Sequence, residues 1–120
     1  LLRRPRSPGG IDNGRGGPHD GLRQFGTLSI DPLAREVLVD GEAVDLTKTE
    51  FDLLATLSER PRQVFTRRQL IDAVWGTTWI GDEHLVDIHL GHVRRRLGDD
   101  PITAKFVLTV RGIGYRMGQG

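Results

Sequence analysis

The stretch of sequence that decides the fold is residues 83–98, EHLVDIHLGHVRRRLG. On a helix that turns about 100° per residue, its large apolar side chains fall on one side, with the spacing i, i+4, i+7 and i+11. These side chains are Val86, Leu90, Val93 and Leu97. Gly98 is a typical helix end because glycine readily adopts a positive φ. The pattern predicts a helix over residues 83–97 with a single buried stripe.

The other side of this helix carries hydrogen-bond donors and positive charge. It presents His84, Ile88, Gly91, His92 and Arg95, with Arg94 and Arg96 on its flanks. A helix with an apolar back and a basic front fits the DNA major groove, which is wide enough for one helix. Ile88 is suited to pack on a thymine methyl group, and Gly91 leaves room for close approach. The alternative is a solvated face that merely happens to be basic.

The residues after this helix weaken that alternative. Residues 106–110 and 115–117 read as two strands, joined by a turn at residues 111–114. The resulting hairpin, residues 106–117, has Arg111 at its tip, and an arginine there is suited to enter a narrow minor groove. The helix and the hairpin therefore both carry positively charged side chains suited to contact the same DNA.

Two capping boxes precede the long helix. Thr47 is followed three residues later by Glu50, and Thr66 by Gln69, each directly before an apolar run. They predict one helix that ends at Arg60-Pro61 and a second that ends at Gly76.

Short strands are expected before these helices, at residues 25–30, 35–39 and 43–46, with a hairpin turn at Asp40-Gly41. The predicted class is α+β: a winged helix-turn-helix with an N-terminal antiparallel β-sheet, three helices and a C-terminal β-hairpin wing.

Charge is sorted along the 120 residues, although the net charge is only +1. Residues 25–59 carry two cations against eight acids, and residues 60–120 carry ten against six. Residues 1–24 hold five Arg, six Gly and three Pro. A segment of this composition buries too little apolar surface to offset the conformational entropy that it would lose on folding. We therefore expect a flexible linker over 1–24 and one domain over 25–120. The absence of cysteine excludes disulfides and thiolate metal sites.

Catalytic and metal sites are not favoured by the sequence. His89 and His92 lie one turn apart, but no HExxH motif or fourth ligand accompanies them, and His92 is expected to point away from the core beside Arg95 and Arg96. Ser29 and Ser58 have no histidine nearby in the sequence to activate them. We expect neither an enzyme nor a cofactor.

Taken in order, several motifs resemble a known family. They are LTKTEFDLL at 46–54, VWG at 74–76, VDIHL at 86–90, RRRL at 94–97 and TVRGIGYR at 109–116. Residues 25–118 resemble the OmpR/PhoB-type winged-helix effector domain of bacterial two-component response regulators. Residues 1–4 resemble the end of the last helix of a receiver domain.

This resemblance implies that the protein regulates transcription in the cytoplasm, with the helix in the major groove and the wing at the minor groove. Implied partners are double-stranded DNA, RNA polymerase, a receiver domain with its sensor kinase, and a second copy on DNA; no membrane is implied. Together with the helix analysis, it gives as DNA-contacting residues Trp75, His84, Ile88, His89, Gly91, His92, Arg94, Arg95, Arg96, Thr109, Arg111 and Gly112. The polymerase-contacting loop is Gly76, Thr77, Thr78, Trp79, Ile80, Gly81 and Asp82.

The resemblance gives individual roles to some of these residues. Arg94 would hold a phosphate, His89 would touch the DNA backbone, and Ile88 would face a base methyl group. Gly91 and His92 stand where the family often has polar or basic residues, which predicts a different operator sequence. Two other functions stay open: a protein-interaction module of the same fold, and a one-component regulator without a receiver domain.

Overall fold

Four short antiparallel strands open the part of the chain that the computed structural model describes, residues 21–100 and 102–120. In sheet order they are β1 (Arg23–Phe25), β2 (Leu28–Asp31), β3 (Glu36–Val39) and β4 (Glu42–Ala43). Asp40 and Gly41 have φ values of 54° and 80°, as a tight hairpin turn requires. The predicted turn between β3 and β4 is confirmed.

The sheet differs from the expected strands at both ends. β1 begins at Arg23, two residues before the expected start of the domain, and the Arg23 guanidinium donates to Ala55 O (3.1 Å) and Ser58 Oγ (2.8 Å). β4 ends at Ala43, although Val44 N still donates to Val37 O at 2.8 Å. Residues 1–20 of the predicted linker, including residues 1–4, lie outside the described residues.

Both capping boxes form as predicted. Helix α1 (Lys48–Glu59) begins where Glu50 N donates to Thr47 Oγ1 (3.2 Å) and Thr47 N donates to Glu50 Oε1 (3.0 Å). Helix α2 (Arg67–Val74) has the same reciprocal pair between Thr66 and Gln69. Each box satisfies backbone N–H groups that the first helical turn leaves without a partner.

The third helix and the hairpin complete the fold. Helix α3 (His84–Leu97) ends at Gly98, whose φ is 75°. Strands β6 (Val107–Val110) and β7 (Gly114–Met117) form the wing, and β5 (Phe65–Thr66) pairs with the other edge of β7. The sequence did not predict this pairing, which joins the start of α2 to the wing.

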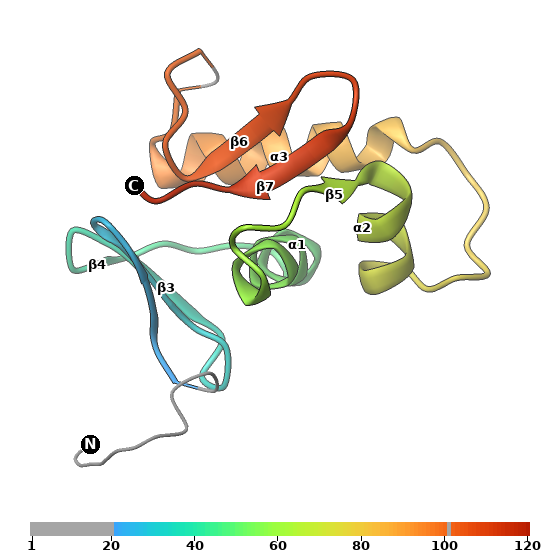
Figure 1. The fold of residues 1–120 in the computed structure, drawn as a ribbon. Helices are drawn as coiled ribbons and strands as arrows, with labels where there is room; N and C mark the ends of the chain where they lie inside the picture. Colours follow the sequence, from blue (N-terminus) through green and yellow to red (C-terminus); the bar gives the residue numbers. More distant parts are fainter. Residues whose placement is uncertain (1–20, 101) are drawn as a thin grey trace.

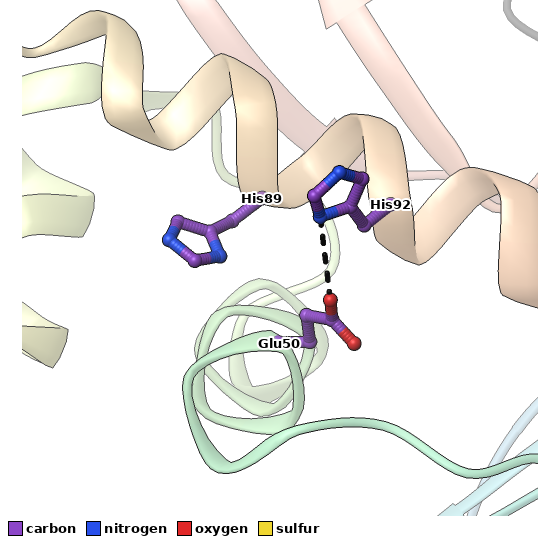
Figure 2. Close-up of side chains that lie close together, drawn as sticks. All are labelled: Glu50, His89 and His92. Atoms are coloured by element: carbon purple, nitrogen blue, oxygen red, sulfur yellow. Dashed lines mark ion pairs between the residues drawn. The ribbon is translucent and has the colours of Figure 1, made fainter.

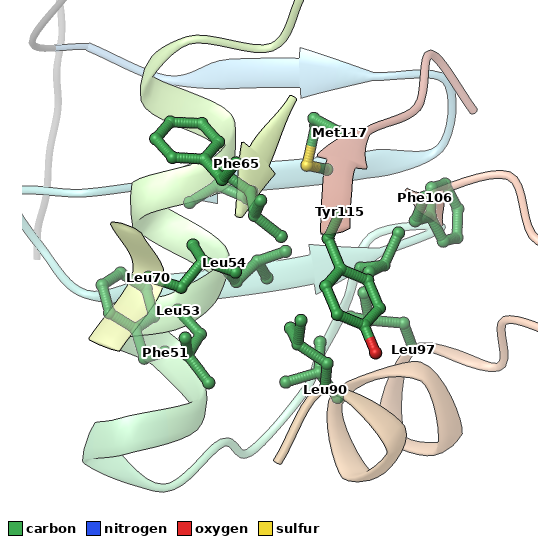
Figure 3. Close-up of a cluster of buried hydrophobic side chains, with 14 of the residues drawn as sticks. Phe51, Leu53, Leu54, Phe65, Leu70, Leu90, Leu97, Phe106, Tyr115 and Met117 are labelled. Carbon is green, nitrogen blue, oxygen red and sulfur yellow. The ribbon is translucent and has the colours of Figure 1, made fainter. Parts of the chain in front are cut away.

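One hydrophobic core holds these elements together. Figure 1 shows α1 at the centre of the molecule, between the strands β3 and β4 on one side and α2, α3 and the wing on the other. Figure 3 shows side chains from α1, α2, α3 and the wing meeting in this core. Its labelled members are Phe51, Leu53, Leu54, Phe65, Leu70, Leu90, Leu97, Phe106, Tyr115 and Met117. In the described part of the chain, every helix is too short or too polar to cross a membrane.

Candidate nucleic-acid interface

Helix α3 has the two faces that its sequence predicts. Val86, Leu90 and Val93 are fully buried and Leu97 is 4% exposed. On the other side, Ile88 is 56% exposed. His84, Arg95 and Arg96 are exposed as well. The outer face therefore offers an apolar contact flanked by donors.

Gly91 lies on this helix with open space around it. A Cβ atom added there would meet no atom within 4 Å beyond the helix's own backbone. Packing inside the protein therefore gives no reason for a glycine, which costs about 1 kcal/mol relative to alanine in a helix. Close approach of a partner molecule to the helix backbone would explain the glycine at this position.

The three consecutive arginines have different surroundings. Arg94 donates through Nε (3.1 Å) and Nη2 (3.0 Å) to Val107 O, and also to Thr109 Oγ1. Arg96 donates to Asp45 O at 2.9 Å. Arg95 is exposed. The expected phosphate contact of Arg94 stays a prediction, and in this structure its guanidinium joins α3 to the wing.

The wing tip is exposed. Arg111, Gly112 and Ile113 form the turn, in which Gly112 has a φ of 75° and Ile113 is 53% exposed. Ile113 N donates to Val110 O at 3.0 Å and so closes the turn. The Arg111 side chain therefore projects from a structured hairpin rather than from a loose loop.

A polar cluster that the sequence did not reveal connects α3 with α2 and β7. The Asp87 carboxylate accepts from Arg67 Nε at 2.8 Å and from the Tyr115 hydroxyl. Burial, followed by the hydrogen bond to Asp87, raises the pKa of Tyr115 to about 12. The hydrogen bond to Asp87 also raises the pKa of Arg67. The three residues come from distant parts of the chain, so no local motif signals them.

A second unpredicted contact lies just after α3. The Asp99 carboxylate is buried, with the residue 5% exposed, and accepts from the backbone N–H groups of Lys105 (2.8 Å), Phe106 (3.1 Å) and Val107 (2.9 Å). These bonds fix where the wing leaves the end of α3. In the sequence, Asp99 is one of two adjacent aspartates after a glycine, which is an ordinary loop composition.

Residues 76–82 connect α2 to α3 as an open loop, visible at the right edge of Figure 1. Trp79 packs against Trp75, with ring centroids 5.9 Å apart, and Trp75 also lies 5.6 Å from the His89 ring. Ile80 is 94% exposed. Trp75 is therefore partly enclosed by aromatic neighbours, and its expected DNA contact stays a prediction.

His92 is not oriented as the sequence suggested. Its Nδ1 atom lies 3.5 Å from Oε2 of Glu50, a residue that is 3% exposed at the start of α1. Figure 2 shows His89 and His92 both turned toward Glu50. The expectation that His92 points away beside Arg95 and Arg96 is wrong. The reason is that α1 supplies a buried carboxylate, which helix periodicity alone cannot reveal.

Comparison with known proteins identifies the family. Residues 41–117 match the family model described as transcriptional regulatory protein, C terminal. The chain belongs to this family. The assignment to this family of transcriptional regulators confirms the sequence-based identification, and the antiparallel sheets, three helices and wing confirm the predicted fold class.

Named relatives of this C-terminal transcriptional regulatory domain are longer proteins. The sensory transduction protein RegX3 of Mycolicibacterium smegmatis is 39% identical over 108 residues, which cover 90% of this chain and 47% of the relative. The DNA-binding response regulator MtrA of the same species is 45% identical over 97 residues, covering 81% and 42%. The chain thus spans less than half the length of these relatives.

Two solved structures resemble this transcriptional regulatory domain. The Klebsiella pneumoniae RstA DNA-binding domain in complex with the RstA box has a TM-score of 0.75 and 32% identity, covering 82% of this chain and 98% of that one. The response regulator DrrB of Thermotoga maritima, an OmpR/PhoB homologue, has the same TM-score and identity and covers 82% and 44%.

Proposed function

We propose that this chain is the sequence-specific, double-stranded-DNA-binding effector domain of a response regulator that controls transcription. The observation that carries the proposal is the outer face of α3, where Ile88 is 56% exposed opposite the buried stripe. Family membership and the likeness to the RstA domain bound to its box support it.

In this proposal, α3 lies in the major groove. Ile88 packs on a thymine methyl group, while His84 and Arg95, both exposed, donate to base edges or phosphates. Gly91 allows the helix to approach closely because nothing occupies the space above it. His92 and His89 remain candidate contacts, although both imidazoles face Glu50 in the free protein.

The wing would contact the adjacent minor groove. Arg111 at its exposed tip is suited to the negative potential of a narrow A·T tract. Thr109 is also exposed on β6, beside Arg94, and we propose that these two residues contact the DNA backbone between the grooves. Gly112 would leave its N–H available at the tip.

Further partners follow from the same assignment. We propose that the loop of residues 76–82, in which Ile80 is 94% exposed, contacts RNA polymerase, as the family resemblance implies. We also propose that a receiver domain, addressed by a sensor kinase, controls the chain, and that two copies bind DNA together. The work of such a domain is binding rather than catalysis, and it takes place in the cytoplasm.

Selection from a pool of random duplexes by the 120-residue chain tests the central proposal. We expect one sequence motif to be enriched and its affinity to fall steeply with salt, as phosphate contacts require. Ile88→Asp should abolish the enrichment, since a carboxylate cannot pack on a thymine methyl. Leu33→Asp is a matched control, because Leu33 is 77% exposed in the N-terminal sheet region.

Enrichment of no motif would contradict sequence-specific binding and would favour the protein-interaction module. The one-component alternative is decided differently, by whether the coding sequence upstream of residue 1 encodes a receiver domain. An enriched motif is compatible with either arrangement of the full-length protein.

A further inference from the structure

Glu50, His89 and His92 form a cluster of potential metal ligands between α1 and α3. One donor atom from each of the three residues lies within 4.8 Å of the other two. The histidines are three positions apart on α3, a spacing that puts both side chains on one side of a helix. Glu50 reaches the same point from the first turn of α1, as Figure 2 shows. Ligands from two helices therefore converge.

His89 supplies the observation that points to a ligand. Among residues 21–100 and 102–120, its Nδ1 is the one buried side-chain nitrogen or oxygen atom without a hydrogen-bond partner. Buried polar atoms are almost always hydrogen-bonded, so an exception calls for a bound water or ion. A ring nitrogen of His89 is turned toward Glu50 in Figure 2. The atom lacking a partner thus faces the other two donors.

The carboxylate of Glu50 is already oriented. Its Oε1 atom accepts from Thr47 N at 3.0 Å in the capping box, and Oε2 lies toward His92 at 3.5 Å. A hydrogen bond that fixes one oxygen of a ligating carboxylate is typical of metal sites. The capping box therefore holds the Glu50 carboxylate in a position where it can also bind a metal ion.

Two of the three neighbouring arginines direct their guanidinium groups to hydrogen-bond acceptors outside the cluster. The Arg94 guanidinium is bonded to Val107 and Thr109 in β6, and the Arg96 guanidinium to the Asp45 carbonyl. The negative charge of Glu50 is, by contrast, buried within the cluster.

We propose that Glu50, His89 and His92 bind a divalent transition-metal ion with the preferences of Zn²⁺. Two imidazoles and one carboxylate, with water as the fourth ligand, form a common tetrahedral set for this ion. Zinc bonds of about 2.0–2.1 Å require donors about 3.3 Å apart, so the donors must close by up to about 1.5 Å. His92, half-exposed, has the freedom to move. The inference does not rest on DNA binding.

Binding of Zn²⁺ and of Co²⁺ to the 120-residue chain tests this site. We expect one ion per chain by calorimetry, a tetrahedral Co²⁺ absorption spectrum, and a higher unfolding temperature with Zn²⁺, because the ion binds the folded state. Glu50→Gln keeps a residue suited to the capping box but removes the negative charge. Glu50→Gln and His92→Gln should each weaken binding at least about tenfold, because removal of only a hydrogen-bond partner of a ligand already costs about that much.

The other two histidines provide the control. The double variant His19→Gln/His84→Gln retains all three proposed ligands and should bind with unchanged affinity and spectrum. The metal-free unfolding temperature of each variant separates a lost ligand from a lost fold.

The proposal is overturned if a folded Glu50→Gln or His92→Gln protein binds as tightly as the unchanged chain. It is equally overturned if the His19→Gln/His84→Gln control loses the ion, or if the unchanged chain yields no tetrahedral Co²⁺ spectrum.

Discussion

At the scale of single residues, Tyr115 shows how one buried hydroxyl links two elements. The residue is 4% exposed, and its hydroxyl donates to Asp87 of α3. Both the burial and the hydrogen bond favour the protonated phenol, so they raise the pKa of Tyr115 to about 12. Proton loss in the folded protein would place a second negative charge against the Asp87 carboxylate.

Spectroscopic titration measures this directly because the chain has a single tyrosine. We expect the tyrosinate absorbance to appear with a midpoint at about 12 in the folded protein, and at about 10 in denaturant. Since the folded pKa is the higher one, its stabilising contribution is complete below about pH 10. It is lost as the pH rises through about 12. A folded-state midpoint near that of free tyrosine would contradict the assigned burial and hydrogen bond.

Gly91 gives a second prediction at this scale. Gly91→Ala should stabilise the free protein by about 1 kcal/mol, because alanine is the better helix former and the site is open. The same methyl group should weaken operator binding if the helix backbone approaches DNA closely there. Urea unfolding and duplex titration measure the two effects. A variant that gains stability and keeps full affinity would remove Gly91 from the interface.

At the scale of elements, the wing depends on a close approach of two strands. A Cβ atom on Gly114 would lie 1.9 Å from Phe65 O of β5, a distance at which the strands must separate. We expect Gly114→Ala to lower the free energy of unfolding by about 1–3 kcal/mol, as overpacking typically does. Urea unfolding checks this, with Gly91→Ala as the control glycine substitution. Unchanged stability would mean that β5 does not pair with β7 in solution.

The wing also carries a functional prediction. Arg111→Ala should weaken binding to the selected duplex by about 1–3 kcal/mol and reduce the salt slope by about one. Arg62→Ala, at an exposed cation in the loop between α1 and β5, is the matched control and should change neither value. Titrations over a salt series distinguish the two variants. An unchanged slope for Arg111→Ala would leave the wing without a phosphate contact.

Sequence reasoning succeeded for elements whose signals are local. Thr47 with Glu50 and Thr66 with Gln69 mark helix starts over four residues, and the stripe ending at Leu97 marks a buried face. It did not find contacts that only folding creates. Asp99 accepts from residues up to eight positions away, and His92 meets a carboxylate 42 positions earlier. No spacing rule within one helix encodes such meetings.

At the scale of the whole molecule, charge is divided between two regions. Residues 25–59, which include β2 to β4 and α1, hold eight acids against two cations, whereas residues 60–120 hold ten cations against six acids. This modest excess of positive charge limits the affinity of one copy for a polyanion. We therefore predict that strong binding depends on a second copy beside the first.

Duplexes with one or two direct repeats of the selected motif test that dependence. We expect the two-repeat duplex to be bound at least about tenfold more tightly per site, because the second copy binds beside an occupied neighbour. The same pair of repeats moved apart by half a helical turn is the control and should lose the gain. Equal affinity per site on both duplexes would indicate independent monomers.

We expect the buried Asp99 carboxylate to restrict which DNA sites the protein can bind. Because three backbone N–H groups converge on it and Arg94 joins α3 to β6, the helix and the wing cannot change their separation independently. The helix and the wing would then contact DNA at a fixed distance from each other. A base pair inserted between the part of the operator read by α3 and the part read by the wing would put one of them out of reach. In this way the protein would select DNA sites by their internal spacing as well as by their base sequence.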